Sequence, residues 1–247
     1  MKAQYQTFIN NNETQSVQTF NNIMALNGLC ERDSVRHLQV VVQEMFPQTI
    51  GLVALDLGAG RGVNAMALAE LGFNVVAYDM YRNSVAVLQR IALQQDLNIS
   101  FGMGGILHLE SLNKKFDMIH DSECLTNTIT ATDRARFLEG VKKSLEAGGK
   151  FVLTAAVQSE QYIPEESFES IRLDADHVLW RETPACDIHG VVEYDDKFWV
   201  AQKRVMPAQV LRQELKNAGF DIITEEIEVR ADAPALMRLV LTSAQGC

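Results

Sequence analysis

Several features that mark whole classes of protein are scarce in this sequence. Its 247 residues include only four cysteines, and no two of them form a C-x-x-C pair. This spacing argues against a disulfide framework and against a zinc site, and the five histidines form no ligand cluster either. We therefore expect no metal ion, and we expect reduced thiols in a cytoplasmic protein.

Basic residues and long apolar runs are scarce as well. Lys and Arg number 22 against 32 Asp and Glu, which gives a formal net charge of −10. Because nucleic-acid binding is driven largely by cationic side chains, we expect a small-molecule ligand rather than DNA or RNA. No apolar run reaches the length of a membrane span, and residues 1–16 lack the apolar core of a signal peptide. We expect no membrane partner, and the oligomeric state stays open.

The most informative stretch that is present runs from Val53 to Asp79. Its pattern predicts a buried strand at residues 53–57 and then a turn made by Gly58, Gly60 and Gly62. A helix at 63–71 and a second buried strand at 73–78 follow. Such a turn lets a nucleotide-like ligand lie almost on the backbone, where a Cβ would collide with it. Asp79 is placed to accept hydrogen bonds from both hydroxyls of a ribose. The stretch therefore predicts an adenosyl site.

Two ligand classes use this architecture. The dinucleotide fingerprint G-x-G-x-x-G needs a glycine where this chain has Val63. The pattern D-x-G-x-G-x-G in ALDLGAGRG instead resembles the first motif of the class I S-adenosylmethionine-dependent methyltransferases of small-molecule type. The resemblance implies that Asp56 contacts the ammonium group of the cofactor, that Asp79 holds its ribose and that Met80 packs on its adenine. The glycine loop, with Gly58, Ala59 and Gly60, holds its methionine half.

Two later segments are similar to further motifs of this family. The strand predicted at 116–120 is followed by Asp121, where substrate meets cofactor in doubly wound sheets. LEAGGKFVLTAA resembles the family's sixth motif, a turn at Gly148 and Gly149 before a fifth strand. The third strand, at 99–101, lacks the acid that many members use to bind adenine, so we assign this contact to Gly105 and Ile106. The candidate bases are His120, with an ordinary pKa near 6.5, Asp121 and Glu123, and Asp121 is also a candidate ligand of the cofactor's ammonium group.

The remaining pattern predicts helices on either side of these strands and a β-rich insertion. The expected elements are helices at 14–28, 33–45, 83–95, 132–145 and 207–218, a hairpin turning at Asp195–Asp196, and strands at 220–229 and 236–242. Asn83 or Ser84 is expected to cap the third helix, and Thr132 or Asp133 the fourth. We predict a three-layer, doubly wound, Rossmann-like sheet of seven strands with an antiparallel last strand. Residues 1–49 form an N-terminal helical segment, 50–156 with 207–247 the methyltransferase domain, and 157–206 an inserted β-rich cap.

The insertion offers candidate residues for binding the methyl acceptor. They are Trp180, Arg181, Tyr194, Trp199 and Arg204. An aromatic wall with one or two cations suits an amphipathic or carboxylate-bearing acceptor. Alternatively, the two tryptophans form the core of the insertion itself and the cations are solvated.

The leading hypothesis is methyl transfer from S-adenosylmethionine, which becomes S-adenosylhomocysteine, to an oxygen, nitrogen or sulfur atom of a small metabolite. Such an in-line displacement depends largely on positioning. Two alternatives remain. One is a sensor or partner-binding protein that keeps the cofactor site without turnover, which the missing adenine acid favours. The other is a nicotinamide-dependent oxidoreductase, against which Val63 argues.

Overall fold

A central sheet of seven strands organises the structure, a computed structural model that describes residues 33–161, 169–184, 190–231 and 233–244. In sheet order, the strands are β10 (Phe220–Glu228), β11 (Ala235–Ser243), β5 (Leu145–Val157), β4 (Phe116–Ser122), β1 (Val53–Leu57), β2 (Asn74–Asp79) and β3 (Ile99–Met103). β11 runs antiparallel to both of its neighbours, and the pairs from β5 to β3 are all parallel. The predicted fold class is confirmed. The helix predicted at 14–28 lies outside the described residues.

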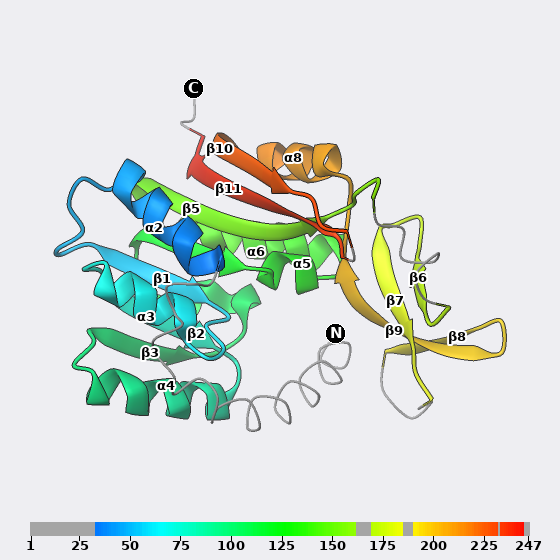
Figure 1. The fold of residues 1–247 in the computed structure, drawn as a ribbon, viewed down its shortest axis with the longest axis horizontal. Helices are drawn as coiled ribbons and strands as arrows, with labels where there is room; N and C mark the ends of the chain where they lie inside the picture. The colour runs from blue at the N-terminus through cyan, green and yellow to red at the C-terminus, as the bar shows by residue number, and fades with distance from the viewer. Residues whose placement is uncertain (1–32, 162–168, 185–189, 232, 245–247) are drawn as a thin grey trace.

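Helices cover both faces of this sheet and complete three layers (Figure 1). One face packs against α2 (Asp33–Met45), α3 (Val63–Glu70) and α4 (Arg82–Gln94), and the other against the 3-10 helix η2 (Ile106–Leu112), α5 (Cys124–Asn127), α6 (Ala131–Ser144) and α8 (Ala208–Asn217). Strand alternation explains the two cores, since Leu55 and Leu57 enter one and Ala54 enters the other. In the described residues, no helix combines the length and hydropathy needed to cross a membrane.

A second, antiparallel sheet, which we call the inserted sheet, lies between β5 and α8 in the chain. Its strands, in sheet order, are β6 (Ile171–Leu173), β7 (Val178–Glu182), β9 (Lys197–Arg204) and β8 (Val191–Tyr194). Asp195 and Asp196 have φ values of 51° and 56°, which are typical of a two-residue hairpin turn, so the predicted hairpin is confirmed. The insertion begins and ends side by side, because Gln158 N–H donates to the carbonyl of Met206 at 3.0 Å. The division into domains stays an interpretation.

Three predicted element boundaries were wrong. The fourth predicted helix, α6, is capped by Thr130, whose side chain accepts from Asp133 N–H, rather than by Thr132 or Asp133. Helix α4 begins at Arg82 after Tyr81 and not behind a cap at residues 83–84. Strand β5 already begins at Leu145, so the two glycines at 148–149 lie within the strand rather than in a turn before it. A register shift against β4 occurs beside them.

Candidate active site

The glycine loop between β1 and α3 lies at the carboxyl ends of the parallel strands of the central sheet. Gly58, Gly60 and Gly62 have φ values of 59°, 51° and 79°, in the left-handed region that favours glycine. A Cβ on Gly58 would lie 2.3 Å from Cys124 Sγ, so a side chain at this position would collide with the segment after β4. The loop is also tied to β2, since Gly60 N–H donates to Asp79 Oδ2 at 2.7 Å.

Asp79 is buried at the end of β2, and both of its carboxylate oxygens accept backbone hydrogen bonds. Its Oδ1 accepts from Tyr81 N–H at 2.8 Å, and its Oδ2 accepts from Gly60 N–H. Burial raises the pKa of Asp79, and these backbone hydrogen bonds oppose that rise. Each carboxylate oxygen has two lone pairs, so each oxygen of Asp79 can still accept a hydrogen bond from one hydroxyl group.

A buried Asp–His pair lies one residue before the carboxyl end of β1 and two residues before that of β4. Parallel pairing sets Asp56 opposite His120, and His120 Nδ1 lies 2.7 Å from Asp56 Oδ1, with both side chains 2% exposed. A carboxylate only accepts hydrogen bonds, so Nδ1 of His120 carries the proton of this hydrogen bond. Asp56 Oδ2 is buried and has no partner among the described residues. Sequence reasoning named both residues but missed their pairing, which depends on β4 lying beside β1.

Asp121, the next residue of β4, faces the opposite side of the sheet and caps α5. Its Oδ1 accepts from Cys124 N–H at 2.7 Å and its Oδ2 from Leu125 N–H at 2.9 Å. Burial raises the pKa of Asp121 to about 6, against the opposing effect of these two hydrogen bonds. Burial, and then Asp121, raises the pKa of the Cys124 thiol well above its usual range, which favours the protonated form of this partly buried thiol. The roles of Asp121 as a base or cofactor ligand stay predictions.

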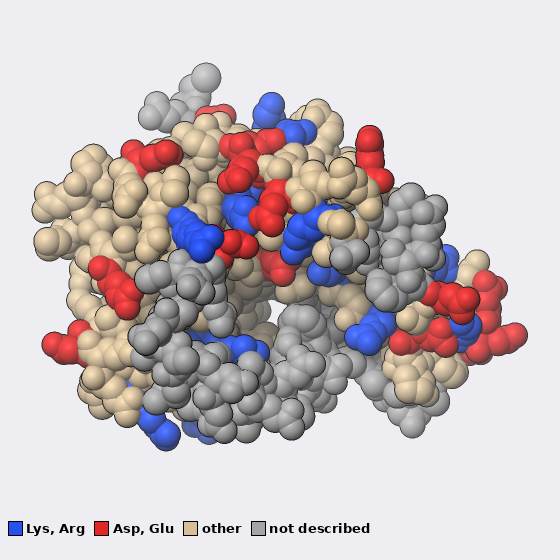
Figure 2. Space-filling view, viewed as in Figure 1, with Lys and Arg blue, Asp and Glu red and all other residues tan. Residues whose placement is uncertain are grey.

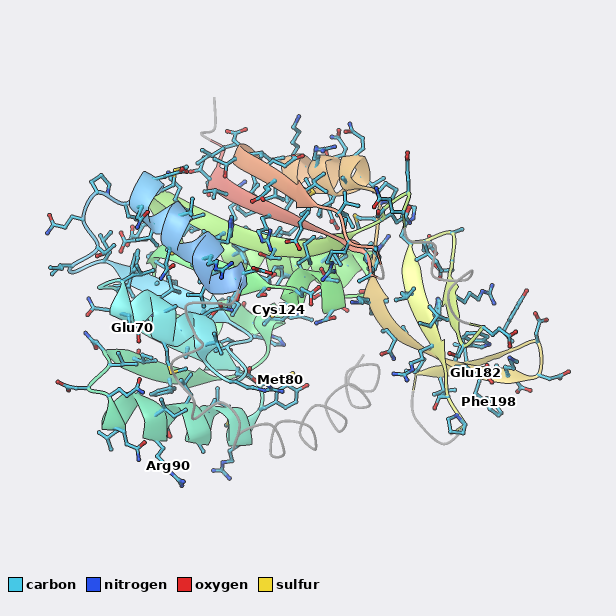
Figure 3. The ribbon with its side chains drawn as sticks, in the orientation of Figure 1. Glu70, Met80, Arg90, Cys124, Glu182 and Phe198 are labelled. Atoms are coloured by element: carbon cyan, nitrogen blue, oxygen red, sulfur yellow. The ribbon has the colours of Figure 1, made fainter. Side chains whose placement is uncertain are left out.

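The predicted adenine side of the site carries exposed apolar groups. Met80 is 46% exposed and Met103 62% exposed. Met80 directly follows β2, and Met103 is the last residue of the adjacent strand β3. A Cβ built on Gly105 has no atom within 4 Å, so the backbone there is open to a flat ligand. Ile106 follows at the start of η2. Figure 3 shows Met80 and Cys124 on the side of the central sheet that faces the inserted sheet.

An arginine clamp that sequence reasoning missed holds the segment after β4. Arg134, buried in α6, donates through Nη1 to the carbonyls of Leu125 and Thr128, and its Nε and Nη2 bind both oxygens of Glu214 in α8. The bidentate pair joins residues 80 positions apart. No local pattern in the sequence signals such a contact.

Comparison with known proteins identifies the family. Residues 49–210, more than half of the chain, match the sequence model of a protein family described as a methyltransferase domain. The chain belongs to the class I S-adenosylmethionine-dependent methyltransferases. This confirms the resemblance that the glycine motif and its two acids indicate.

Individual relatives of this methyltransferase match it in part. The cypemycin N-terminal methyltransferase of a Streptomyces species is 32% identical over 114 residues, which are 44% of this chain and 44% of that protein. The ubiquinone biosynthesis O-methyltransferase of Coxiella burnetii is 32% identical over 100 residues, 40% of this chain and 42% of that protein. The match spans less than half the length of either relative. A solved S-adenosylmethionine-dependent methyltransferase from Clostridium acetobutylicum shares the fold, with a TM-score of 0.63 and 15% identity over 85% of this chain and 91% of that one.

The residues of this methyltransferase fit its family's cofactor in two respects. Within the described part of the chain, Asp56 Oδ2 is a buried acceptor without a donor, as an ammonium group would require. The backbone at Gly60 and Gly105 has room that a side chain would fill, since a Cβ there meets nothing closer than 3.7 Å. In the described residues, no group of three or more His, Cys, Asp and Glu could hold a metal ion.

The five predicted acceptor-binding residues of the methyltransferase do not share one surface. Trp199 is buried, and its indole N–H donates to the carbonyl of Tyr194 at 3.2 Å. Tyr194 itself is exposed and stacks under the guanidinium of Arg172, and Arg181 is exposed. Trp180 and Arg204 are half-buried next to the segment after β4. Their roles in binding stay predictions.

Proposed function

We propose that this chain transfers the methyl group of S-adenosylmethionine to a small acceptor held between the central sheet and the inserted sheet. The observation that carries the proposal is the glycine loop joined to Asp79, together with the unpartnered Asp56 Oδ2. In this proposal Asp79 binds the ribose, Asp56 the ammonium group, and Met80 the adenine. The bound cofactor supplies an electrophilic methyl group on a sulfonium.

The atom that accepts the methyl group belongs to the same proposal. The two relatives are named for an N-terminal and an O-methyl transfer, so nitrogen and oxygen acceptors both have support. An oxygen or sulfur acceptor must lose its proton, and a neutral imidazole is a suitable base near pH 7. We assign this proton to Nε2 of His120, because Asp56 accepts from Nδ1–H and so orients the ring with Nε2 as its acceptor nitrogen.

Turnover tests the proposed activity directly. The protein is incubated with S-adenosylmethionine and matched panels of small phenols, amines and thiols, and formation of S-adenosylhomocysteine is measured. We expect formation that depends on one acceptor class. Tight cofactor binding with no turnover on any panel would contradict the enzyme assignment and favour a sensor.

If His120 is the base, replacing it should lower the rate of methyl transfer without weakening cofactor binding. His120→Gln should lower kcat for an oxygen acceptor by roughly 100-fold or more, because the variant cannot take the proton. The dissociation constant of S-adenosylhomocysteine, measured by calorimetry, should stay within about threefold. Loss of cofactor binding in this variant would instead show that His120 serves to orient Asp56, and it would refute the role as a base. His108→Gln is the matched control, since His108 is exposed and pairs only with surface residues.

A further inference from the structure

Arg204, the last residue of β9, has an unsatisfied guanidinium. In the described residues it is the one cationic side chain with a buried nitrogen that lacks an acceptor, its Nε. Its Nη1 donates to the carbonyl of Ile129 at 3.2 Å, and no ion pair joins it to a carboxylate in the described part of the chain. Burying a charged donor without a partner is costly. A buried guanidinium nitrogen without an acceptor in the described residues is the more unexpected in a chain with 32 acidic residues and a net charge of −10.

The same face of the inserted sheet carries an apolar surface. The register of β7 and β9 sets Val178 opposite Arg204 and Trp180 opposite Ala201, and residues directly opposite on antiparallel strands share a face. Val178, Ala201 and Trp180 pack in one cluster with Ile129. The indole N–H of Trp180 donates to Asp174 Oδ2 at 2.7 Å, which holds the ring in place. A cation therefore lies beside an aromatic and aliphatic surface.

This face also lies near the place where the acceptor must bind. Ile129 lies five positions after Cys124, and Cys124–Asn127 form α5. At 1.5 Å per helical residue and about 3.4 Å per extended residue, Ile129 lies within about 12 Å of Cys124. A small molecule held at Arg204 can therefore reach the carboxyl end of β4.

We propose that Arg204 binds an anionic group of the methyl acceptor, a carboxylate or a phosphate, while the apolar body of the acceptor lies against Trp180. This inference rests on the methyl-transfer function proposed above and names the class of its substrate. A guanidinium offers parallel N–H donors that match two oxygens of such an anion. The anion would give Nε the acceptor that the described chain does not supply.

Calorimetric titration of the protein saturated with S-adenosylhomocysteine tests the proposal. The probes are benzoate, phenyl phosphate and, as the neutral analogue, benzamide. The variants are Arg204→Gln, Arg204→Lys and the control Lys203→Gln. Lys203 is a suitable control because it is also half-buried but lies opposite Leu179, on the other face of the strand.

We expect at least one anion to bind the native protein and Lys203→Gln about tenfold more tightly than benzamide, or better. Arg204→Gln should lose that preference, and Arg204→Lys should keep part of it because it keeps the charge without the planar donors. Whichever anion binds more tightly identifies the group. Equal binding of anions and benzamide, no anion binding up to about 10 mM, or a preference that survives in Arg204→Gln would overturn the proposal.

The proposed cofactor is tested separately in the same experiment. S-adenosylhomocysteine should bind the native protein and all three variants equally, because none of the changed residues touches the glycine loop. If it fails to bind the native protein, the proposed function fails, and the anion titration without it still decides the role of Arg204 by the same criteria.

Discussion

At the scale of single residues, the glycines of the site differ in what a side chain would meet. Gly58→Ala combines a positive φ with a Cβ only 2.3 Å from Cys124 Sγ, and we expect a loss of about 2–4 kcal/mol of stability from strain and overpacking. Gly105→Ala meets no atom, so its stability should stay within about 0.5 kcal/mol while affinity for S-adenosylhomocysteine falls. Thermal unfolding with calorimetry measures both. Unchanged affinity in Gly105→Ala would remove Gly105 from the adenine site.

Asp121 should give the stability of the protein a pH dependence between pH 3.8 and about 6. In this range the folded state binds the proton and the unfolded state releases it, so stability falls as pH rises through the window. Compared with Asp121→Asn, the native protein should lose roughly 2 kcal/mol between pH 4.5 and pH 7. Urea unfolding at both pH values measures the difference. A difference of the opposite sign would mean that the helix cap outweighs burial.

At the scale of elements, the arginine clamp between α6 and α8 should contribute far more than a surface ion pair. Arg134→Met leaves Glu214 and two carbonyls without their donor, and we expect a loss of about 3–5 kcal/mol. The matched control is an ion pair on α8, where Arg212 pairs with Glu225 at partly exposed positions. Arg212→Met should cost about 1 kcal/mol or less. Similar losses for the two variants in urea unfolding would contradict the clamp.

Local elements were largely predictable, and the contacts between them were not. The strand at 53–57 and the hairpin at Asp195–Asp196 were predicted because apolar runs and turn residues act locally. The cap of helix α6 was misplaced by two or three residues because Thr130, Thr132 and Asp133 all suit a cap, and only the fold selects Thr130. The Asp56–His120 pair spans 64 positions and depends on the strand order, which periodicity does not encode.

At the scale of the whole molecule, the inserted sheet should be separable from the cofactor site. Residues 157 and 206 are bridged directly, so replacing residues 159–205 by a short glycine linker closes the chain without moving β5 or α8. We expect a protein that still binds S-adenosylhomocysteine and no longer methylates its acceptor, with Ile129 newly exposed. Loss of cofactor binding in this variant, measured by calorimetry on folded protein, would contradict the proposed division into domains.

The surface charge of the molecule agrees with a small-molecule acceptor. Acidic side chains gather at the far end of the inserted sheet (Figure 2), where Glu193, Asp195 and Asp196 are exposed. Such a surface repels phosphate backbones. We expect no retardation of duplex DNA or RNA in a gel-shift assay even at low salt. Binding that weakens steeply with salt would contradict this expectation.

The most direct test of the central claim is calorimetry with S-adenosylmethionine, S-adenosylhomocysteine and NADH on the native protein and on Asp79→Ala. The account predicts binding of the two adenosyl compounds, no binding of NADH, and a loss of at least about tenfold in affinity in Asp79→Ala. At about 100 times its dissociation constant, either adenosyl compound should add roughly 2.7 kcal/mol of stability. Binding of NADH alone, or adenosyl binding that is unchanged in Asp79→Ala, would contradict the account.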